Sequence, residues 1–260
     1  MADGRVAVSK VGAVIVAAGS STRMGGVDKI FAPLLGLPLV MHTIDRFELS
    51  PRVHQIVLVV ARNSVDRAQE LVRQRAYKKV TGVCAGGRRR QDSVRFGLES
   101  LNCCEWVMVH DGARPCLDES VLQRGLEAAA EYGAAVAGVP VKDTIKMVSS
   151  QQIVDRTPDR SLLWAAQTPQ IFRFRTLLDA HHGANQDVTD DAAMIEALGH
   201  PVKMFLGAYE NIKVTTAEDL VIAEAFLQSK DNHQITNSDY YPCAWGKGSL
   251  GQSSLGWSRP

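Results

Sequence analysis

An apolar run followed at once by a loop of small residues most constrains what this chain can fold into. Residues 13–18, AVIVAA, carry no charge and predict a strand that is buried on both faces. At Gly19 the sequence changes to GSSTRMGGVDK, where glycine lets the backbone turn sharply and present its N–H groups. Arg23 and Lys29 add two cations beside this turn. The stretch therefore predicts a strand that leads into a phosphate-binding loop.

Two common phosphate-binding motifs do not fit this loop. In a Walker A motif the second glycine would fall on Met24, and a Ser or Thr would stand where Ile30 follows Lys29. The dinucleotide-binding pattern requires a glycine at Ser21. What remains, AAGSSTRMGGxDK after a strand, resembles the signature loop of nucleotidyltransferases that make nucleoside-diphosphate sugars and alditols. The alternative is a glycine-rich turn that carries two solvated cations.

Composition narrows the class of protein. The chain has 260 residues, of which 45% are hydrophobic and 22% charged, with a net charge of +1, as expected for a globular protein with one main domain. A net charge near zero argues against a broad nucleic-acid surface. The sequence contains no run of about 18 apolar residues, so no membrane span is predicted. Residues 1–10 lack the apolar core of a signal peptide.

The cysteines point to a reducing compartment. There are 5 of them, and no two have C-x-x-C spacing. An odd number without that spacing argues against a disulfide framework and against a zinc site. We therefore expect a cytoplasmic protein with reduced thiols.

Strand and helix patterns alternate along most of the chain. Further strands are predicted at 55–61, 80–84, 106–110, 134–139, 202–206 and 212–214, and helices at 37–48, from 63, and at 92–101, 119–132, 172–182, 190–198 and 215–227. This repetition predicts an α/β fold with a parallel sheet, right-handed crossovers and helices on both faces. Thr189 is expected to cap the helix over 190–198, and Thr215 and Glu218 have capping-box spacing for the last helix.

Three polar loops are expected at one edge of this sheet. They follow Ala18, Cys84 and His110, each at the end of a predicted strand. Ligands of such sheets bind beyond the C-terminal ends of the strands. We therefore expect the three loops to converge on one crevice.

Two segments depart from the alternation. Residues 142–170 show short alternating runs with turns between them, which predict a β-hairpin arm outside the main sheet. Because a lone hairpin cannot bury both faces, we expect the arm to pack against a partner subunit; the alternative is a mobile surface insertion. Residues 229–260 are rich in Asn, Ser, Gly and Gln without an apolar period and predict a disordered tail.

Seven motifs follow one another in a fixed order: AAG…R…K from Ala17, GG…RxDSV from Gly86, HDGARP from His110, DTIK from Asp143, DR…LW…QTPQ from Asp159, TDDAA from Thr189 and NIKVT from Asn211. In this order and spacing, residues 11–228 resemble the 2-C-methyl-D-erythritol 4-phosphate cytidylyltransferases, a family of the non-mevalonate isoprenoid pathway. The resemblance implies a catalytic domain over 11–228, built as a Rossmann-like three-layer sandwich with a mostly parallel sheet and a protruding β-arm. It also implies a homodimer with exchanged arms, CTP as donor, an alditol phosphate as acceptor and Mg2+ as cofactor.

The same resemblance implies roles for single residues. Catalytic roles fall on Arg23 and Lys29, which would stabilise charge on the α-phosphate, and on Arg160 and Lys213, which would position the nucleophile. Nucleotide binding falls on Ala17, Ala18, Gly19, Gly87, Ser93 and Asp111. Asp111 is also the candidate Mg2+ ligand. Binding of the alditol phosphate falls on Arg114, Thr144, Thr168 and Thr189.

The residue types agree with this chemistry. A phosphate monoester has a second pKa of about 6 and is largely dianionic at neutral pH, so it attacks the α-phosphorus of CTP without a general base. The task is to bring two anions together, which cations in a preorganised loop achieve. Ribitol or glycerol phosphate is the alternative acceptor, although the DTIK and DRSLLW strings favour methylerythritol phosphate. A non-catalytic nucleotide-binding domain is a third reading, which cations at both ends of the reacting phosphates argue against.

Overall fold

The computed structural model describes residues 10–19, 29–183 and 187–232. Within them, the centre of the fold is a seven-stranded sheet in the order β11-β7-β10-β6-β1-β4-β5. Its strands are β1 (Val11–Ala17), β4 (Gln55–Val60), β5 (Val80–Ala85), β6 (Trp106–Asp111), β7 (Ala134–Pro140), β10 (Trp164–Arg173) and β11 (Lys203–Leu206). All run parallel except β10, which pairs antiparallel with β6 and β7. The expected mostly parallel sheet is confirmed.

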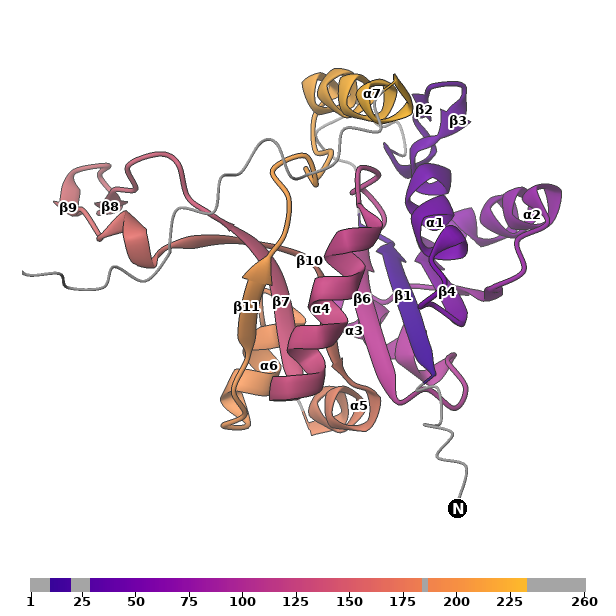
Figure 1. The fold of residues 1–260 in the computed structure, drawn as a ribbon, viewed down its shortest axis with the longest axis horizontal. Coiled ribbons are helices and arrows are strands. Elements are labelled where there is room, and N and C mark those ends of the chain that lie inside the picture. The colour runs from indigo at the N-terminus through magenta and orange to yellow at the C-terminus, as the bar shows by residue number, and fades with distance from the viewer. Residues whose placement is uncertain (1–9, 20–28, 184–186, 233–260) are drawn as a thin grey trace, which may run out of the picture.

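Helices cover both faces of the sheet (Figure 1). One face packs against α1 (Leu39–Leu49), α2 (Val65–Arg75) and α4 (Glu119–Tyr132), and the other against α3 (Arg90–Glu99), α5 (Phe174–Gly183) and α6 (Asp191–Ala197). Successive residues of a strand point to opposite faces, so Ala13 and Ile15 join the first core while Val14 joins the second. This is the expected three-layer sandwich, and it explains why the central strands read as unbroken apolar runs.

A third, smaller core lies at the edge where the parallel strands end. There α7 (Ala217–Asn232) packs over the short strands β2 (Pro33–Leu34) and β3 (Leu37–Pro38) (Figure 1). Leu34, Ala113, Val214 and Leu227 are all buried in this cluster. The cluster ties the loop after β6 to α7. No helix among the described residues is long and apolar enough to cross a membrane.

The arm projects from the body between β7 and β10 (Figure 1). It contains β8 (Met147–Val148), β9 (Val154–Arg156) and the 3-10 turn η4 (Arg160–Leu162). Its apolar side chains are exposed: Val148 by 53%, Ile153 by 64% and Leu162 by 79%. The predicted arm is confirmed up to this point, but its predicted end is wrong. Residues 164–170 belong to β10 of the main sheet, because residues 164–166 pair with β7 and Gln170 pairs with both β6 and β7.

Several predicted boundaries also need correction. Residues 212–214 form no strand of the sheet; Val214 makes one backbone hydrogen bond, to Ala113. Phe172 belongs to β10 and not to a helix, because it pairs with β6 and β7. The cap of α6 is Asp190, not Thr189, since the Asp190 carboxylate accepts the Ala193 N–H. Residues 230–232 extend α7 and so do not belong to a tail, and 233–260 lie outside the described residues.

Candidate active site

The loops after β1, β5 and β6 meet at the C-terminal edge of the sheet. Gly86 donates its N–H to the Val60 carbonyl at 2.8 Å, and a Cβ placed on Gly86 would overlap the Cβ of Ala18. Gly112 donates to the Val16 carbonyl at 2.8 Å, and its Cβ would lie 2.8 Å from the Cβ of Ala17. Only glycine allows such close approach. The expected convergence of the three loops is confirmed.

Ser93 shapes the loop that follows β5. Its buried hydroxyl accepts the Gly87 N–H at 3.1 Å and donates to the Arg89 carbonyl at 3.1 Å. A Cβ on Gly87 would collide with the Asp92 side chain. Gly87 and Ser93, which were both predicted as site residues, therefore hold the loop after β5 against the start of α3.

Asp111, at the end of β6, lies close to cations from three separate segments of the chain. Its Oδ2 lies 3.2 Å from Arg114 Nε and 3.1 Å from Lys213 Nζ, and its Oδ1 lies 3.9 Å from Arg90 Nε. Burial by itself raises the pKa of Asp111, but Lys213, Arg114 and Arg90 together lower it to about 2. Asp111 is therefore ionised at neutral pH. Arg114 and Lys213 share the single charge of Asp111, while Arg90 is also paired with the buried Asp191 at 2.6 Å.

The segment that carries Lys213 is fastened through Asn211. Arg114 donates from Nη1 to the Asn211 carbonyl at 2.7 Å, while its Nε faces Asp111. The fully buried Asn211 amide donates to the Thr168 carbonyl at 2.7 Å. Lys213 is thus presented to Asp111 by a backbone that β6 and β10 both hold.

Thr168 lies beneath Asp111 and not on the arm. Its hydroxyl accepts the Asp111 N–H at 3.0 Å and donates to His110 Nδ1 at 3.0 Å, and His110 Nε2 then donates to the Arg114 carbonyl at 3.2 Å. Burial lowers the pKa of His110 to about 4, so its ring is neutral. The prediction that Thr168 stands outside the sheet is wrong, because the antiparallel strand β10 carries it into the core beside β6.

The other predicted residues are spread around this centre. Lys29 opens the 3-10 turn η2 (Lys29–Phe31), and Gly19 is exposed just past β1. Arg23 lies outside the described residues. Thr189 is exposed in the turn before α6.

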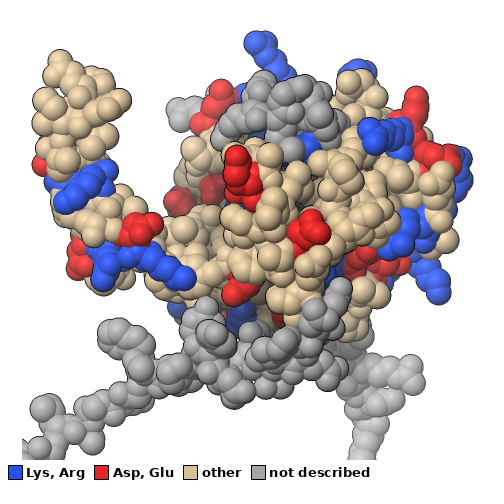
Figure 2. Space-filling model, turned by 90° about the horizontal axis from the view of Figure 1, so that it is seen from above, with Lys and Arg blue, Asp and Glu red and all other residues tan. Residues whose placement is uncertain are grey.

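The two predicted residues of the arm are not brought to Asp111 within one chain. Thr144 is exposed, and Arg160 donates to the Lys142 carbonyl at 2.9 Å. Lys142 and Arg160 line a hollow of about 490 Å³ at the base of the arm. Figure 2 shows charged side chains gathered towards that base and an uncharged tip that stands away from the body.

Sequence reasoning left out Arg90, His110 and Asn211 as site residues. Arg90 reaches both Asp111 and Asp191, whereas His110 and Asn211 are buried supports. The signal for Arg90 was present, because it stands directly before the QDSV string that opens α3. The partners of His110 and Asn211 lie about 60 and 40 positions away, so no local pattern identifies them.

One carboxylate at this edge suits Mg2+. The described residues contain no group of three or more His, Cys, Asp or Glu side chains that would form a cage for a metal ion. Mg2+ is commonly held by one or two carboxylates together with substrate phosphates. Asp111 fits that arrangement, because it is ionised and, within the described part of the chain, the ion-pair partner of its Oδ1 is Arg90 at 3.9 Å.

Comparison with known proteins decides the family. The family model for 2-C-methyl-D-erythritol 4-phosphate cytidylyltransferase matches residues 11–229. The chain belongs to the 2-C-methyl-D-erythritol 4-phosphate cytidylyltransferase family. It is therefore an enzyme of the nucleotidyltransferase class, and the motif resemblance is confirmed.

Individual relatives agree with this assignment. A 2-C-methyl-D-erythritol 4-phosphate cytidylyltransferase of Dehalococcoides mccartyi is 51% identical over 219 residues, which cover 84% of this chain and 96% of the relative. The enzyme of the same name from Alkaliphilus metalliredigens is 46% identical and covers 87% and 97%. Among solved structures, that of 2-C-methyl-D-erythritol 4-phosphate cytidylyltransferase from Thermus thermophilus has a TM-score of 0.69 at 31% identity, covering 84% of this chain and 99% of that one.

Proposed function

We propose that this protein transfers CMP from CTP to 2-C-methyl-D-erythritol 4-phosphate. The products are 4-diphosphocytidyl-2-C-methyl-D-erythritol and pyrophosphate, and the step serves the synthesis of isoprenoid precursors. The observation that carries the proposal is the cluster of Arg90, Arg114 and Lys213 around Asp111, at the edge where the loop after β1 ends. The family assignment favours methylerythritol phosphate over ribitol or glycerol phosphate as acceptor.

The reaction needs positioning and charge stabilisation more than proton transfer. A phosphate oxygen of the acceptor forms a bond to the α-phosphorus of CTP, and the bond from that phosphorus to the pyrophosphate oxygen breaks. The monoester is already mainly dianionic at neutral pH, so no side chain has to remove a proton. In keeping with this, the one histidine of the cluster, His110, is buried and hydrogen-bonded on both ring nitrogens.

The cations divide this work between them. In this proposal Lys29 and Arg23 act on the α-phosphate and stabilise the charge that grows in the transition state. Lys213 and Arg114 hold the acceptor phosphate in line with the bond that breaks. Asp111 fixes both of these cations through Oδ2. Mg2+, held by Asp111 Oδ1 and the triphosphate, would neutralise part of the phosphate charge.

A homodimer completes the site in this proposal. The exposed apolar side chains of the arm, among them Val148 and Ile153, favour a protein partner over solvent. A two-fold partner would bring Thr144 and Arg160 to the acceptor phosphate of the other chain. We place the reaction in the cytoplasm, in keeping with the thiols of Cys84, Cys103 and Cys104, which form no disulfide within the described part of the chain.

A substrate panel tests the proposal. CTP, ATP, GTP and UTP are each combined with methylerythritol, ribitol and glycerol phosphate, and pyrophosphate release is measured. We expect rapid release only with CTP and methylerythritol phosphate. Preference for ribitol or glycerol phosphate would move the assignment to the alternative acceptor. CTP binding without acceptor-dependent release of pyrophosphate would leave a nucleotide-binding domain and overturn the proposal.

A further inference from the structure

Asp191 is a buried carboxylate to which the proposed reaction assigns no role. It is the first residue of α6 and is fully buried. Its Oδ2 accepts from Arg90 Nη1 at 2.6 Å, and its Oδ1 lies 3.1 Å from His181 Nε2. Burial raises the pKa of Asp191, but Arg90 and His181 outweigh burial and hold that pKa below its usual range. Asp191 is therefore an ionised group with both oxygens occupied.

Arg90 stands between Asp191 and the candidate active site. Its hydrogen bond to Asp191 is short, whereas its Nε lies 3.9 Å from Asp111 Oδ1, which is too far for a hydrogen bond. The Arg90 side chain remains 27% exposed. The guanidinium thus presents its charge to the edge of the sheet while Asp191 holds it back from Asp111.

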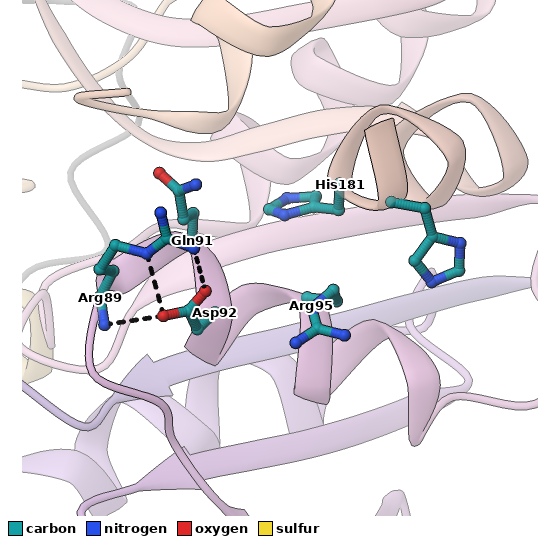
Figure 3. A pocket seen from close by; sticks show the side chains of 6 residues that line it. Arg89, Gln91, Asp92, Arg95 and His181 are labelled. Carbon is teal, nitrogen blue, oxygen red and sulfur yellow. Dashed lines mark hydrogen bonds and ion pairs between the residues drawn. The ribbon is translucent and has the colours of Figure 1, made fainter. Parts of the chain in front are cut away.

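The position of Asp191 is itself fixed by neighbouring elements. Gln170 of β10 accepts the Ala192 N–H at 3.1 Å and donates to Asp190 at 2.8 Å, so the start of α6 is clamped to the sheet. His181 approaches from α5, beside a cavity of about 260 Å³ whose far wall is the first turn of α3 (Figure 3). Asp191 has little freedom to follow Arg90 if Arg90 moves.

Without the charge of Asp191, Arg90 would keep one carboxylate within 4 Å among the described residues, that of Asp111, with Asp190 farther away. Asp111 Oδ1 is the nearest remaining carboxylate oxygen in these contacts, and a rotation of the guanidinium closes the gap. A direct Arg90–Asp111 hydrogen bond would occupy the oxygen suited to Mg2+ and withdraw a cation from the phosphates. The buried ion pair therefore has a consequence at the active site beyond its effect on folding.

We propose that Asp191 is a positioning residue for the transfer reaction, which holds the Arg90 guanidinium towards the reacting phosphates and away from Asp111 Oδ1. The inference rests on the proposed function. Under this inference Asp191, the second aspartate of the TDD string, affects the charge distribution at the active site through Arg90 of α3.

Asp191→Asn is the first test, because it keeps the shape of the side chain and removes its charge. We expect kcat to fall by about 10- to 100-fold, the range found when a partner that orients a ligand residue is removed, with little change in KM for CTP. Glu99→Gln is the matched control. It makes the same chemical change in an exposed ion pair of α3, with Arg95 at 3.3 Å, and should leave kcat unchanged.

A double-mutant cycle shows whether Asp191 acts through Arg90. If it does, the variant with both Asp191→Asn and Arg90→Gln is no slower than Arg90→Gln alone. If the two losses are independent, so that the double variant is slower than Arg90→Gln by the full factor of Asp191→Asn, the inference is overturned. An Asp191→Asn enzyme with lower thermal stability but normal kcat would also overturn it. If Asp191→Asn does not fold, Asp191→Glu keeps the charge, so kcat should stay near the wild-type value; a loss as large as that of Arg90→Gln in that folded variant would overturn the inference.

A crystal structure of Asp191→Asn gives a readout that needs no turnover. We expect the distance from Arg90 to Asp111 Oδ1 to shorten from 3.9 Å to about 3 Å, a hydrogen bond. An unmoved guanidinium would contradict the inference even if the substrate panel succeeds. Conversely, a wild-type chain that fails the panel would refute the proposed function and leave this structural test intact.

Discussion

Two lysines have predicted roles in the candidate active site, and they belong to distant parts of the chain. Lys213 lies 3.1 Å from Asp111, so an acidic residue already fixes its place. Lys29 opens η2, three positions after Gly26. In the proposed reaction Lys29 acts on the α-phosphate, where negative charge grows most in the transition state.

Replacement of Lys29 tests that role. Because one donor to a developing oxyanion is worth about 10²–10³ in kcat, Lys29→Ala should lower kcat by that factor and change KM for CTP far less. Lys78→Ala is the control, since Lys78 is exposed just before β5, at the opposite edge of the sheet. Steady-state kinetics separates the two parameters. Near-normal kcat with only a raised KM would remove Lys29 from the chemical step.

His110 makes the stability of the protein depend on pH. Its pKa is about 4 in the folded chain because of burial, against about 6.5 in the unfolded chain. As pH falls, the unfolded state binds the proton first. The stabilisation is therefore complete above pH 6.5 and is lost as pH falls towards 4, by on the order of 3 kcal/mol in total. Asp111, with a pKa of about 2, titrates below this window.

Denaturant unfolding at a series of pH values measures this loss. The free energy of unfolding should fall between about pH 6.5 and pH 4 in the wild type. His182→Gln should show the same slope, because His182 is exposed on α5. The His110 ring can also be followed directly by NMR. Titration of that ring near its ordinary pKa would show that the buried hydrogen-bonded pair with Thr168 does not persist in solution.

At the scale of elements, α4 shows how one side chain sets a boundary. Asp118 precedes the helix, and its Oδ1 accepts the Ser120 N–H at 2.9 Å. Such a cap satisfies a backbone donor that has no partner inside the helix. The helix then ends at Gly133, whose φ of 86° lies in the left-handed region that glycine adopts readily.

Removal of this cap should destabilise the fold without affecting the site. Asp118→Ala is expected to lower the free energy of unfolding by about 1 kcal/mol, with unchanged kcat per folded molecule. Glu131→Ala, in the exposed last turn of the same helix, is the control and should cost much less. Chemical denaturation compares the two variants. Equal stabilities would mean that the cap contributes nothing measurable.

At the scale of the whole molecule, the arm and the body place predicted site residues far apart. Lys29 belongs to the body, whereas Arg160 lies at the base of the arm, which projects away from it (Figure 1). The uncharged tip of the arm carries the exposed Val148 and Ile153. An arm that reaches across a two-fold axis would account for both features, with each active site built from two chains.

Complementation tests this arrangement. Arg160→Ala and Lys29→Ala chains, each nearly inactive alone, are mixed and allowed to exchange subunits. A mixed dimer then has one site with both changes and one site with neither. Random exchange makes about half of the dimers mixed, so about a quarter of all sites should recover activity. If mass spectrometry confirms exchange and no activity returns, Arg160 serves the site of its own chain.

The sequence by itself determined the layers of the fold and the edge that holds the site. The apolar run of β1 and the period of α4 are local signals, and the predicted helix over 119–132 agrees with α4 residue for residue. The loops after β1, β5 and β6 were expected together because parallel strands end at one edge. Family motifs then identified Asp111, Arg114 and Lys213, which the structure brings within hydrogen-bonding or ion-pair distance.

Only the tertiary structure decided how the site is supported. The pattern of the arm continued into β10 without a break, so nothing local showed that Thr168 would enter the sheet beside His110. Arg90 and Asp191 meet across 101 positions of sequence. The physical reason is the same in both cases. Periodicity shows which side chains share a face of one element, whereas the pairing of strands and the packing of helices choose which distant polar groups satisfy one another once they are buried.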